Sequence, residues 1–273
     1  MPDNTGLPDN TGWSDSRGPL DHLGEFERTA AELAAVFEAV DPAAVVPNCP
    51  AWTVADLALH IGTGQRWAAS ILLSGVGQRE PEVLRTTISW PDWYAGTTAA
   101  LAAAIRAVDP DEPCWNFAPV DQLAGFWARR RLHETAIHLV DALQAGDPAT
   151  GSGPPEGAPA DWWRAIPPAI AADGVDEVFG VFLGRMLARG FPPAVTRQIG
   201  VRAVDTGDEW TLTPVAAGKP PKVDRSRAAG EAVVSGTAFE LDLCLWKRLP
   251  ADRLSVEGDA RVAAELLDGR VTP

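Results

Sequence analysis

Apolar residues recur at three- and four-residue steps in the first half of the chain. In the first such stretch the spacing places Leu20, Leu23, Phe26, Ala30, Leu33, Phe37 and Val40 on one face, as expected of a helix that packs on a core. Comparable patterns predict helices over residues 19–40, 53–75, 93–108 and 123–145. Helices of this length joined by loops predict a four-helix bundle.

Local signals mark the ends of the predicted helices. Pro19 suits the first turn of a helix, and Pro42 stops the first one. Thr53 is placed to cap the second helix, with Asp56 three residues later in an arrangement much like a capping box. We expect that helix to end near Gly75.

The pattern changes after Pro193, where short β-rich segments replace the long apolar stripes. The segments 196–204 and 210–214 are separated by Asp205-Thr206-Gly207-Asp208-Glu209, which is a hairpin signal. The predicted fold is therefore a helical bundle followed by a small α+β domain. Its remaining elements are a leading helix over 168–189, a strand over 231–235, a helix over 239–249, a strand over 254–257 and a helix over 260–267.

Two segments of low complexity suggest how the chain divides. Pro-Asp-Asn-Thr-Gly occurs twice within the first twelve residues and is too polar for a core, so we interpret residues 1–18 as a mobile arm. The run from Gly151 to Pro159 is rich in Gly and Pro, which is typical of a linker. We predict an arm over 1–18, the bundle over 19–150, a linker over 151–160 and the α+β domain over 161–273.

Composition excludes some functions. The net charge of −14 argues against nucleic acid as a partner, because binding to phosphates depends on clustered cations. No apolar run is long enough to span a bilayer, and the N-terminus lacks the basic flank and apolar core of a signal peptide, so we expect a cytoplasmic protein. The three cysteines are widely spaced and form neither a disulfide framework nor a CxxC pair.

The candidate chemistry centres on residues 129–141. Glu134 and His138 lie four residues apart and so share one face of the fourth helix. His60 lies on the inward face of the second helix, while His133 points elsewhere and His22, near a helix start, is expected to be solvated. Two imidazoles and one carboxylate leave coordination positions open, as catalytic zinc prefers, and nickel, manganese or ferrous iron tolerate such a set.

The residue spacing also admits simpler interpretations of this cluster. A Glu–His pair one turn apart is often only a surface contact, and an inward histidine is often a core residue. Trp127, Arg130 and Arg131 lie one to two turns before Glu134, where arginines could clamp a carboxylate substrate. A solvated run over residues 129–131 is the alternative. Asp141 is either a partner that orients His138 or a surface charge.

Three segments resemble a known family. Residues 49–62, Cys-Pro-Ala-Trp-Thr-Val-Ala-Asp-Leu-Ala-Leu-His-Ile-Gly, are similar to the N-terminal metal-binding motif of actinobacterial mycothiol-dependent maleylpyruvate isomerases, which belong to the DinB-like four-helix superfamily. Residues 130–141 resemble the second motif of that family. Residues 234–250 and 256–259 resemble its small C-terminal domain.

This resemblance implies a metal site and a thiol cosubstrate. His60, Glu134 and His138 correspond to the zinc ligands. Arg248 is the candidate for the family's C-terminal arginine near the substrate, although this chain has Trp246-Lys247-Arg248 where members often have Trp-Gly-Arg. We expect Arg248, Arg130 and Arg131 to serve catalysis, and Trp127 and Asp141 to serve cofactor binding.

The implied reaction starts from the thiolate of mycothiol, formed because zinc lowers the pKa of a bound thiol. The thiolate adds to a cis double bond of a small, anionic electrophile, and rotation followed by elimination gives the trans isomer. Three alternatives stay open at this point: a mycothiol S-transferase, a non-catalytic metal-stabilised thiol-binding protein, and a metal-dependent hydrolase with Asp141 as general base. The cysteines Cys49 and Cys114 are expected to be structural rather than nucleophilic.

Overall fold

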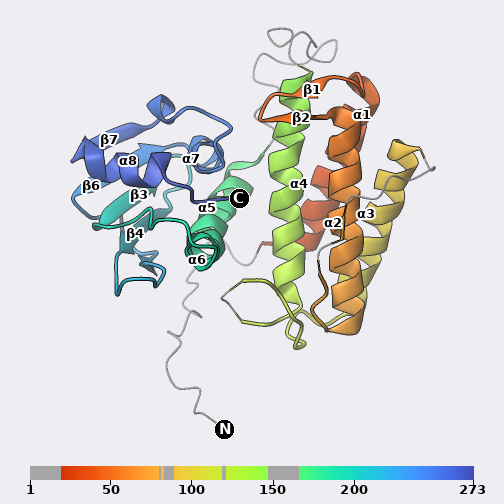
Figure 1. Cartoon of the computed structure of the whole chain (residues 1–273), viewed down its shortest axis with the longest axis horizontal. Coiled ribbons are helices and arrows are strands. Elements are labelled where there is room, and N and C mark those ends of the chain that lie inside the picture. Colours follow the sequence, from red (N-terminus) through yellow and green to blue (C-terminus); the bar gives the residue numbers. More distant parts are fainter. Residues whose placement is uncertain (1–19, 80, 83–88, 119–120, 147–165) are drawn as a thin grey trace.

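The computed structural model describes residues 20–79, 81–82, 89–118, 121–146 and 166–273. Within these ranges the chain forms a helical bundle and an α+β domain that lie side by side (Figure 1). The fold class predicted from the sequence is confirmed. The predicted arm over 1–18 and the predicted linker over 151–160 lie outside the described residues.

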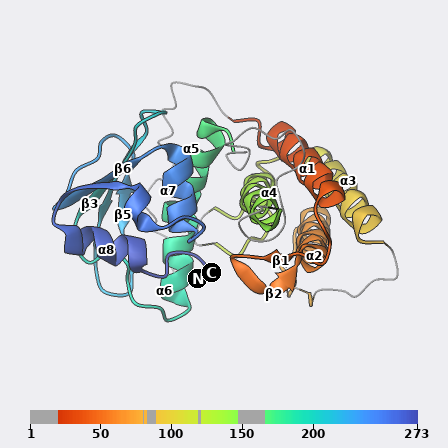
Figure 2. The same cartoon turned by 90° about the horizontal axis from the view of Figure 1, so that it is seen from above.

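The bundle consists of the four predicted helices. They are α1 His22–Ala39, α2 Val54–Ser74, α3 Trp90–Ala107 and α4 Gly125–Ala145. Helix α1 packs on α3 and α4, and α2 packs on the same two helices (Figure 2). The apolar stripes meet in the middle, where Phe26, Leu33, Leu57, Ile61 and Leu132 are fully buried.

The caps of the helices follow the local sequence. Thr53 and Asp56 form the predicted capping box at the start of α2, and Gly75 ends that helix with φ of 69°, a conformation that glycine adopts without strain. Helix α3 begins earlier than predicted because Ser89 caps it and Pro91 fits its first turn.

A short hairpin precedes α2 where the sequence suggested only a turn. Its strands are β1 Val45–Val46 and β2 Cys49–Thr53, paired antiparallel. The hairpin packs on α2 and α4. It thereby carries Cys49 and Trp52 to the wall of the pocket described below.

The α+β domain begins with the predicted helix, which has an interruption. Helix α5 Pro168–Glu177 passes through a π-helical turn, Val178–Phe182, into α6 Leu183–Ala188. Helix α5 lies against α4 of the bundle and against α7 of its own domain. π turns are rare and occur often at functional sites, and Phe182 of this turn lines the pocket described below.

A five-stranded sheet completes the C-terminal domain. Its order is β5-β4-β3-β6-β7, with β3 parallel to β6 and all other pairs antiparallel. The predicted hairpin is confirmed as β3–β4, and Gly207 in its turn has φ of 78°. The strands are β3 Ile199–Ala203, β4 Glu209–Thr213, β5 Lys222–Asp224, β6 Ala232–Gly236 and β7 Ser255–Gly258.

Two short helices flank the last strand. They are α7 Ala238–Leu245 and α8 Ala260–Asp268. The helix predicted over 239–249 ends sooner because Lys247 adopts φ of 62°, which breaks the helical path. Among the described residues, no helix combines the length and apolarity needed to cross a membrane.

Candidate metal centre and pocket

The three predicted metal ligands come together between α2 and α4. One ligand atom from each of His60, Glu134 and His138 lies within 4.8 Å of the others. Glu134 Oε1 is 3.5 Å from Nε2 of His60 and 3.5 Å from Nε2 of His138. Two ligands about 2.0–2.2 Å from a tetrahedral metal lie roughly 3.3–3.6 Å apart. The two carboxylate–imidazole distances therefore fit a shared ion.

The ring of His138 is oriented by a buried carboxylate. Its Nδ1 lies 2.9 Å from Oδ2 of Asp141, which is fully buried. Because a carboxylate only accepts hydrogen bonds, Nδ1 is the donor and Nε2 faces the cluster. Such carboxylate–histidine pairs commonly support metal ligands. Of the two roles open to Asp141, the structure thus favours the partner of His138 over a surface charge.

Arg248 in turn holds Asp141 from the C-terminal domain. Its Nε and Nη2 donate to the two carboxylate oxygens at 3.1 and 2.9 Å. Burial alone would raise the pKa of Asp141, but hydrogen bonds and charge from His138 and Arg248 keep this pKa well below its usual range. Burial would lower the pKa of His138, yet Asp141 and Glu134 together raise it.

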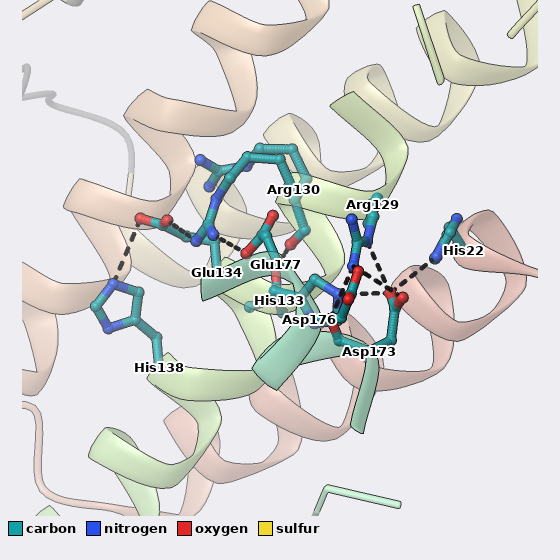
Figure 3. A network of polar contacts seen from close by, with 11 residues as sticks. His22, Arg129, Arg130, His133, Glu134, His138, Asp173, Asp176 and Glu177 are labelled. Atoms are coloured by element: carbon teal, nitrogen blue, oxygen red, sulfur yellow. Dashed lines mark hydrogen bonds and ion pairs between the residues drawn. The ribbon is translucent and has the colours of Figure 1, made fainter. Parts of the chain in front are cut away.

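Glu134 has a different partner on each oxygen. Its Oε1 faces the two histidines. Its Oε2 accepts a hydrogen bond of 2.5 Å from Arg130 Nη2, and Figure 3 shows this contact together with the one to His138. Burial favours the neutral acid, but the charge of Arg130 and the nearby imidazoles of His138 and His60 hold the pKa of Glu134 well below its usual range. The carboxylate is therefore charged at neutral pH, as a metal ligand must be.

The cluster opens into a pocket of about 320 Å³ between the bundle and the C-terminal domain. Arginine is the main source of charge in its walls, and Glu134 is the single acidic side chain among the described lining residues. The arginines are Arg130, Arg131, Arg185, Arg189 and Arg248, and the aromatic lining residues are Trp52, Trp67, Phe117, Trp127, Phe182 and Trp246.

The three consecutive arginines of α4 have three different environments. Arg129 donates to Asp173 and Asp176 of α5 and is not among the pocket-lining residues. Arg130 and Arg131 line the pocket and are only 2% and 5% exposed. An added Cβ at Gly64 would lie 2.7 Å from Arg131 Nη1, so this glycine makes room for the guanidinium against α2. The solvated-run alternative is wrong.

A second polar cluster joins the two domains beside this site. Asp173 Oδ2 lies 2.7 Å from His133 Nε2 and 3.1 Å from His22 Nε2, and Arg129 donates to the same oxygen (Figure 3). His22, expected to be solvated, is only partly exposed, because its ring contacts Asp173 of α5. As expected, His133 points away from the pocket.

More than half of the residues that line the pocket were not predicted from the sequence. Trp67 lies two turns after His60 on the inward face of α2, so helical spacing offered a signal for it. Arg185 and Arg189 are also one turn apart, but only the placement of the C-terminal domain beside the bundle brings them to the pocket. Cys49 lines the pocket, and burial raises the pKa of its thiol, which agrees with the expected structural role.

Comparison with known proteins identifies the family. Residues 23–143 match the model of the mycothiol maleylpyruvate isomerase N-terminal domain. Residues 169–265 match the model of the MDMPI C-terminal domain. The chain belongs to the mycothiol-dependent maleylpyruvate isomerase family. This family of enzymes is the one that the sequence motifs resembled, so that prediction is confirmed.

Two solved structures share the fold of this family member. They are crystal structures of the mycothiol-dependent maleylpyruvate isomerase and of a histidine-to-alanine mutant of it. Each has a TM-score of 0.57 and 15% sequence identity, over 89% of this chain and 95% of that chain. No curated protein sequence matches the chain.

Proposed function

We propose that this protein is a zinc-dependent isomerase of the maleylpyruvate type that uses mycothiol as its thiol cosubstrate. The observation that carries the proposal is the cluster of His60, Glu134 and His138 in the wall of the pocket. Family membership supports the thiol and the isomerisation. The donor set supports zinc, although other divalent ions would also fit it.

The metal would be held by one atom from each of the three side chains. When bound, a divalent ion lowers the pKa of a thiol, so that the thiolate is available at neutral pH. The neighbouring side chains keep the metal ligands in the orientation and charge state that metal binding needs. Asp141 fixes the ring of His138, and Arg130 keeps Glu134 charged.

The proposed reaction neither adds nor removes atoms. The sulfur of the thiolate bonds to one alkene carbon, and the π electrons move to the conjugated carbonyl as an enolate. Rotation about the new single bond follows. The enolate electrons then re-form the double bond while the carbon–sulfur bond breaks, which releases the thiolate and the trans isomer.

The arginine-lined walls favour an anionic electrophile. Guanidinium groups pair with carboxylates through two parallel hydrogen bonds. Arg131 is our candidate for substrate contact, because it lines the pocket one turn before Glu134. Arg130 and Arg248 also line the pocket, but each is bound to carboxylates of the protein itself. We therefore assign them mainly to holding the metal ligands.

Trp127 would contribute an aromatic surface to ligand binding. Its indole is fully buried and lines the pocket, while its Nε1 donates to the carbonyl of Trp115 at 2.9 Å. The ring is thus fixed in place, and its polar atom is already used.

The environment of Asp141 argues against the hydrolase alternative, in which this residue would be the general base. Asp141 is fully buried and bound to His138 and Arg248, which together keep its pKa low. A carboxylate in that state is a poor acceptor for a proton from water. The non-catalytic alternative finds no support in a family of enzymes.

The direct test combines zinc-loaded protein, mycothiol and maleylpyruvate, with products followed by absorbance and mass spectrometry. We expect cis-to-trans conversion with no net consumption of mycothiol, and its loss in the His138→Ala variant. A stable thiol adduct would instead indicate an S-transferase. No reaction of the metal-loaded protein with this substrate would overturn the proposal.

A further inference from the structure

The second oxygen of Glu134 is the starting point. A carboxylate with both oxygens available is able to chelate a metal through both of them and so occupy two coordination positions. In this protein Oε1 faces the histidines, and Oε2 is bound by Arg130 at 2.5 Å. Arg130 therefore leaves Glu134 with one oxygen to offer to an ion.

Arg130 is itself fixed by the C-terminal domain. Its Nη1 donates to Oε2 of Glu177, the last residue of α5, and both side chains are at most 3% exposed. The rings of Phe182 and Trp246 flank the guanidinium, with centroids 4.9 and 5.6 Å from its central carbon. A buried guanidinium bound between two carboxylates has little freedom to turn away from either one.

We infer that Glu177 is a positioning residue for the metal centre, acting through Arg130 to keep Glu134 a one-oxygen ligand. This inference rests on the proposed function. Figure 3 shows the chain of contacts from Glu177 through Arg130 to Glu134 and on to His138. If Glu134 binds through one oxygen only, a coordination position stays open for the thiol. A carboxylate that binds through both oxygens would occupy that position.

The neighbouring residue Asp176 provides a matched control. It is also a buried carboxylate of α5 at the domain interface, 6% exposed, but it binds Arg129, Arg225 and Trp210 rather than Arg130. Glu177→Gln and Asp176→Asn each remove one buried negative charge from the same turn. Only the first change reaches the metal ligands.

The test measures zinc affinity by chelator competition and the visible spectrum of the cobalt-loaded protein. For Glu177→Gln we expect zinc affinity to change about 10–100-fold, the usual size of effect when an outer partner of a ligand is lost. We also expect weaker visible cobalt bands, because added coordination changes the geometry of the site. For Asp176→Asn we expect lower stability with unchanged zinc affinity and cobalt spectrum.

The outcomes separate this inference from the proposed function. Wild-type protein that binds no metal overturns both. Wild-type protein that binds zinc, beside a Glu177→Gln variant with unchanged affinity and spectrum, overturns this inference alone. Equal losses in Glu177→Gln and Asp176→Asn also overturn it, because they indicate general damage to the interface. If Glu177→Gln does not fold, Glu177→Asp keeps the charge, shortens the reach and is judged by the same criteria.

Discussion

Two clusters that include residues of α4 each contain two histidines and one carboxylate, but the distances within them differ. The first joins His60 and His138 to Glu134, and the second joins His22 and His133 to Asp173. In the first cluster the carboxylate oxygen stands 3.5 Å from each imidazole nitrogen. In the second the corresponding distances are 3.1 and 2.7 Å, which are direct hydrogen bonds.

The difference shows what separates a candidate metal site from a structural ion cluster. Arg129 donates to Asp173 and so supplies the positive charge that an ion would otherwise bring. Arg130 binds the far oxygen of Glu134 and leaves the near one facing the histidines. Among the described residues, only the first cluster has one possible ligand atom from each of three residues all within 4.8 Å of one another. The arginine partners of the carboxylate and the distances to the imidazoles therefore distinguish a candidate metal site from an ion cluster, whereas the residue types do not.

The largest expected effect is on metal binding. His138→Ala removes a ligand and should lower zinc affinity more than the ~10–100-fold typical of losing an outer partner. His133→Ala, five residues earlier on the same helix, should leave zinc stoichiometry unchanged. Equilibrium dialysis with metal analysis of both variants gives the comparison. Retained zinc in His138→Ala, or lost zinc in a folded His133→Ala, would contradict the assignment of metal binding to the first cluster.

The next effect is on stability. Asp173→Asn breaks a buried ion pair and leaves Arg129 with less compensating charge, so the free energy of unfolding should fall by about 3–5 kcal/mol. Zinc affinity of the folded variant should stay unchanged, because Asp173 does not touch the ligands of the first cluster. Urea unfolding measures the first quantity and chelator competition the second. A loss below about 1 kcal/mol would show that the second cluster is not a structural one.

The pH dependence of stability should test the role of Asp173 in the second cluster. Burial would raise the pKa of Asp173, but Arg129 and the hydrogen bonds from His133 and His22 hold it well below its usual range. The unfolded value is about 3.9, so the folded state binds fewer protons. This stabilisation is present above pH ~4 and is lost as pH falls towards the folded pKa. Unfolding curves from pH 7 to 3 should show a shallower acid loss in Asp173→Asn, whereas parallel curves would contradict the assignment.

The smallest effect is expected at His22. Its side chain is 26% exposed, and its polar contact among the described residues is the one of 3.1 Å with Asp173, which keeps His133 and Arg129 as partners. His22→Ala should therefore lower the free energy of unfolding by about 1 kcal/mol or less. Thermal unfolding detects a change of this size. A decrease in the free energy of unfolding as large as that expected for Asp173→Asn would mean that His22 is essential to the stability of the second cluster.

The helices of the bundle and the three candidate ligands were predictable because helical periodicity determines them. Spacing alone places Glu134 and His138 on one face of α4 and His60 on the inward face of α2. Their roles as zinc ligands stay a prediction until metal is measured.

The contacts of the second cluster were not predictable, because they depend on how the domains dock. Arg129 and Arg130 are adjacent in sequence yet bind different carboxylates, Asp173 and Glu177, which lie one turn apart on α5. No local pattern signals such pairs. The three-residue strand β5 was also missed, since it is short and mostly exposed.

The π-helical turn Val178–Phe182 constrains the length of the chain as well as its composition. Before it, Glu177 faces Arg130, and after it, Arg185 and Arg189 reach the pocket. Deleting one residue from the turn would restore an α-helix and rotate everything beyond it by about 100° relative to α5. The arginines would then leave the pocket while Glu177 stayed in place. Within this turn, deletion of a single residue would therefore alter the pocket more than any substitution. In a sequence alignment of relatives, a gap placed in this turn would pair arginines that are not equivalent.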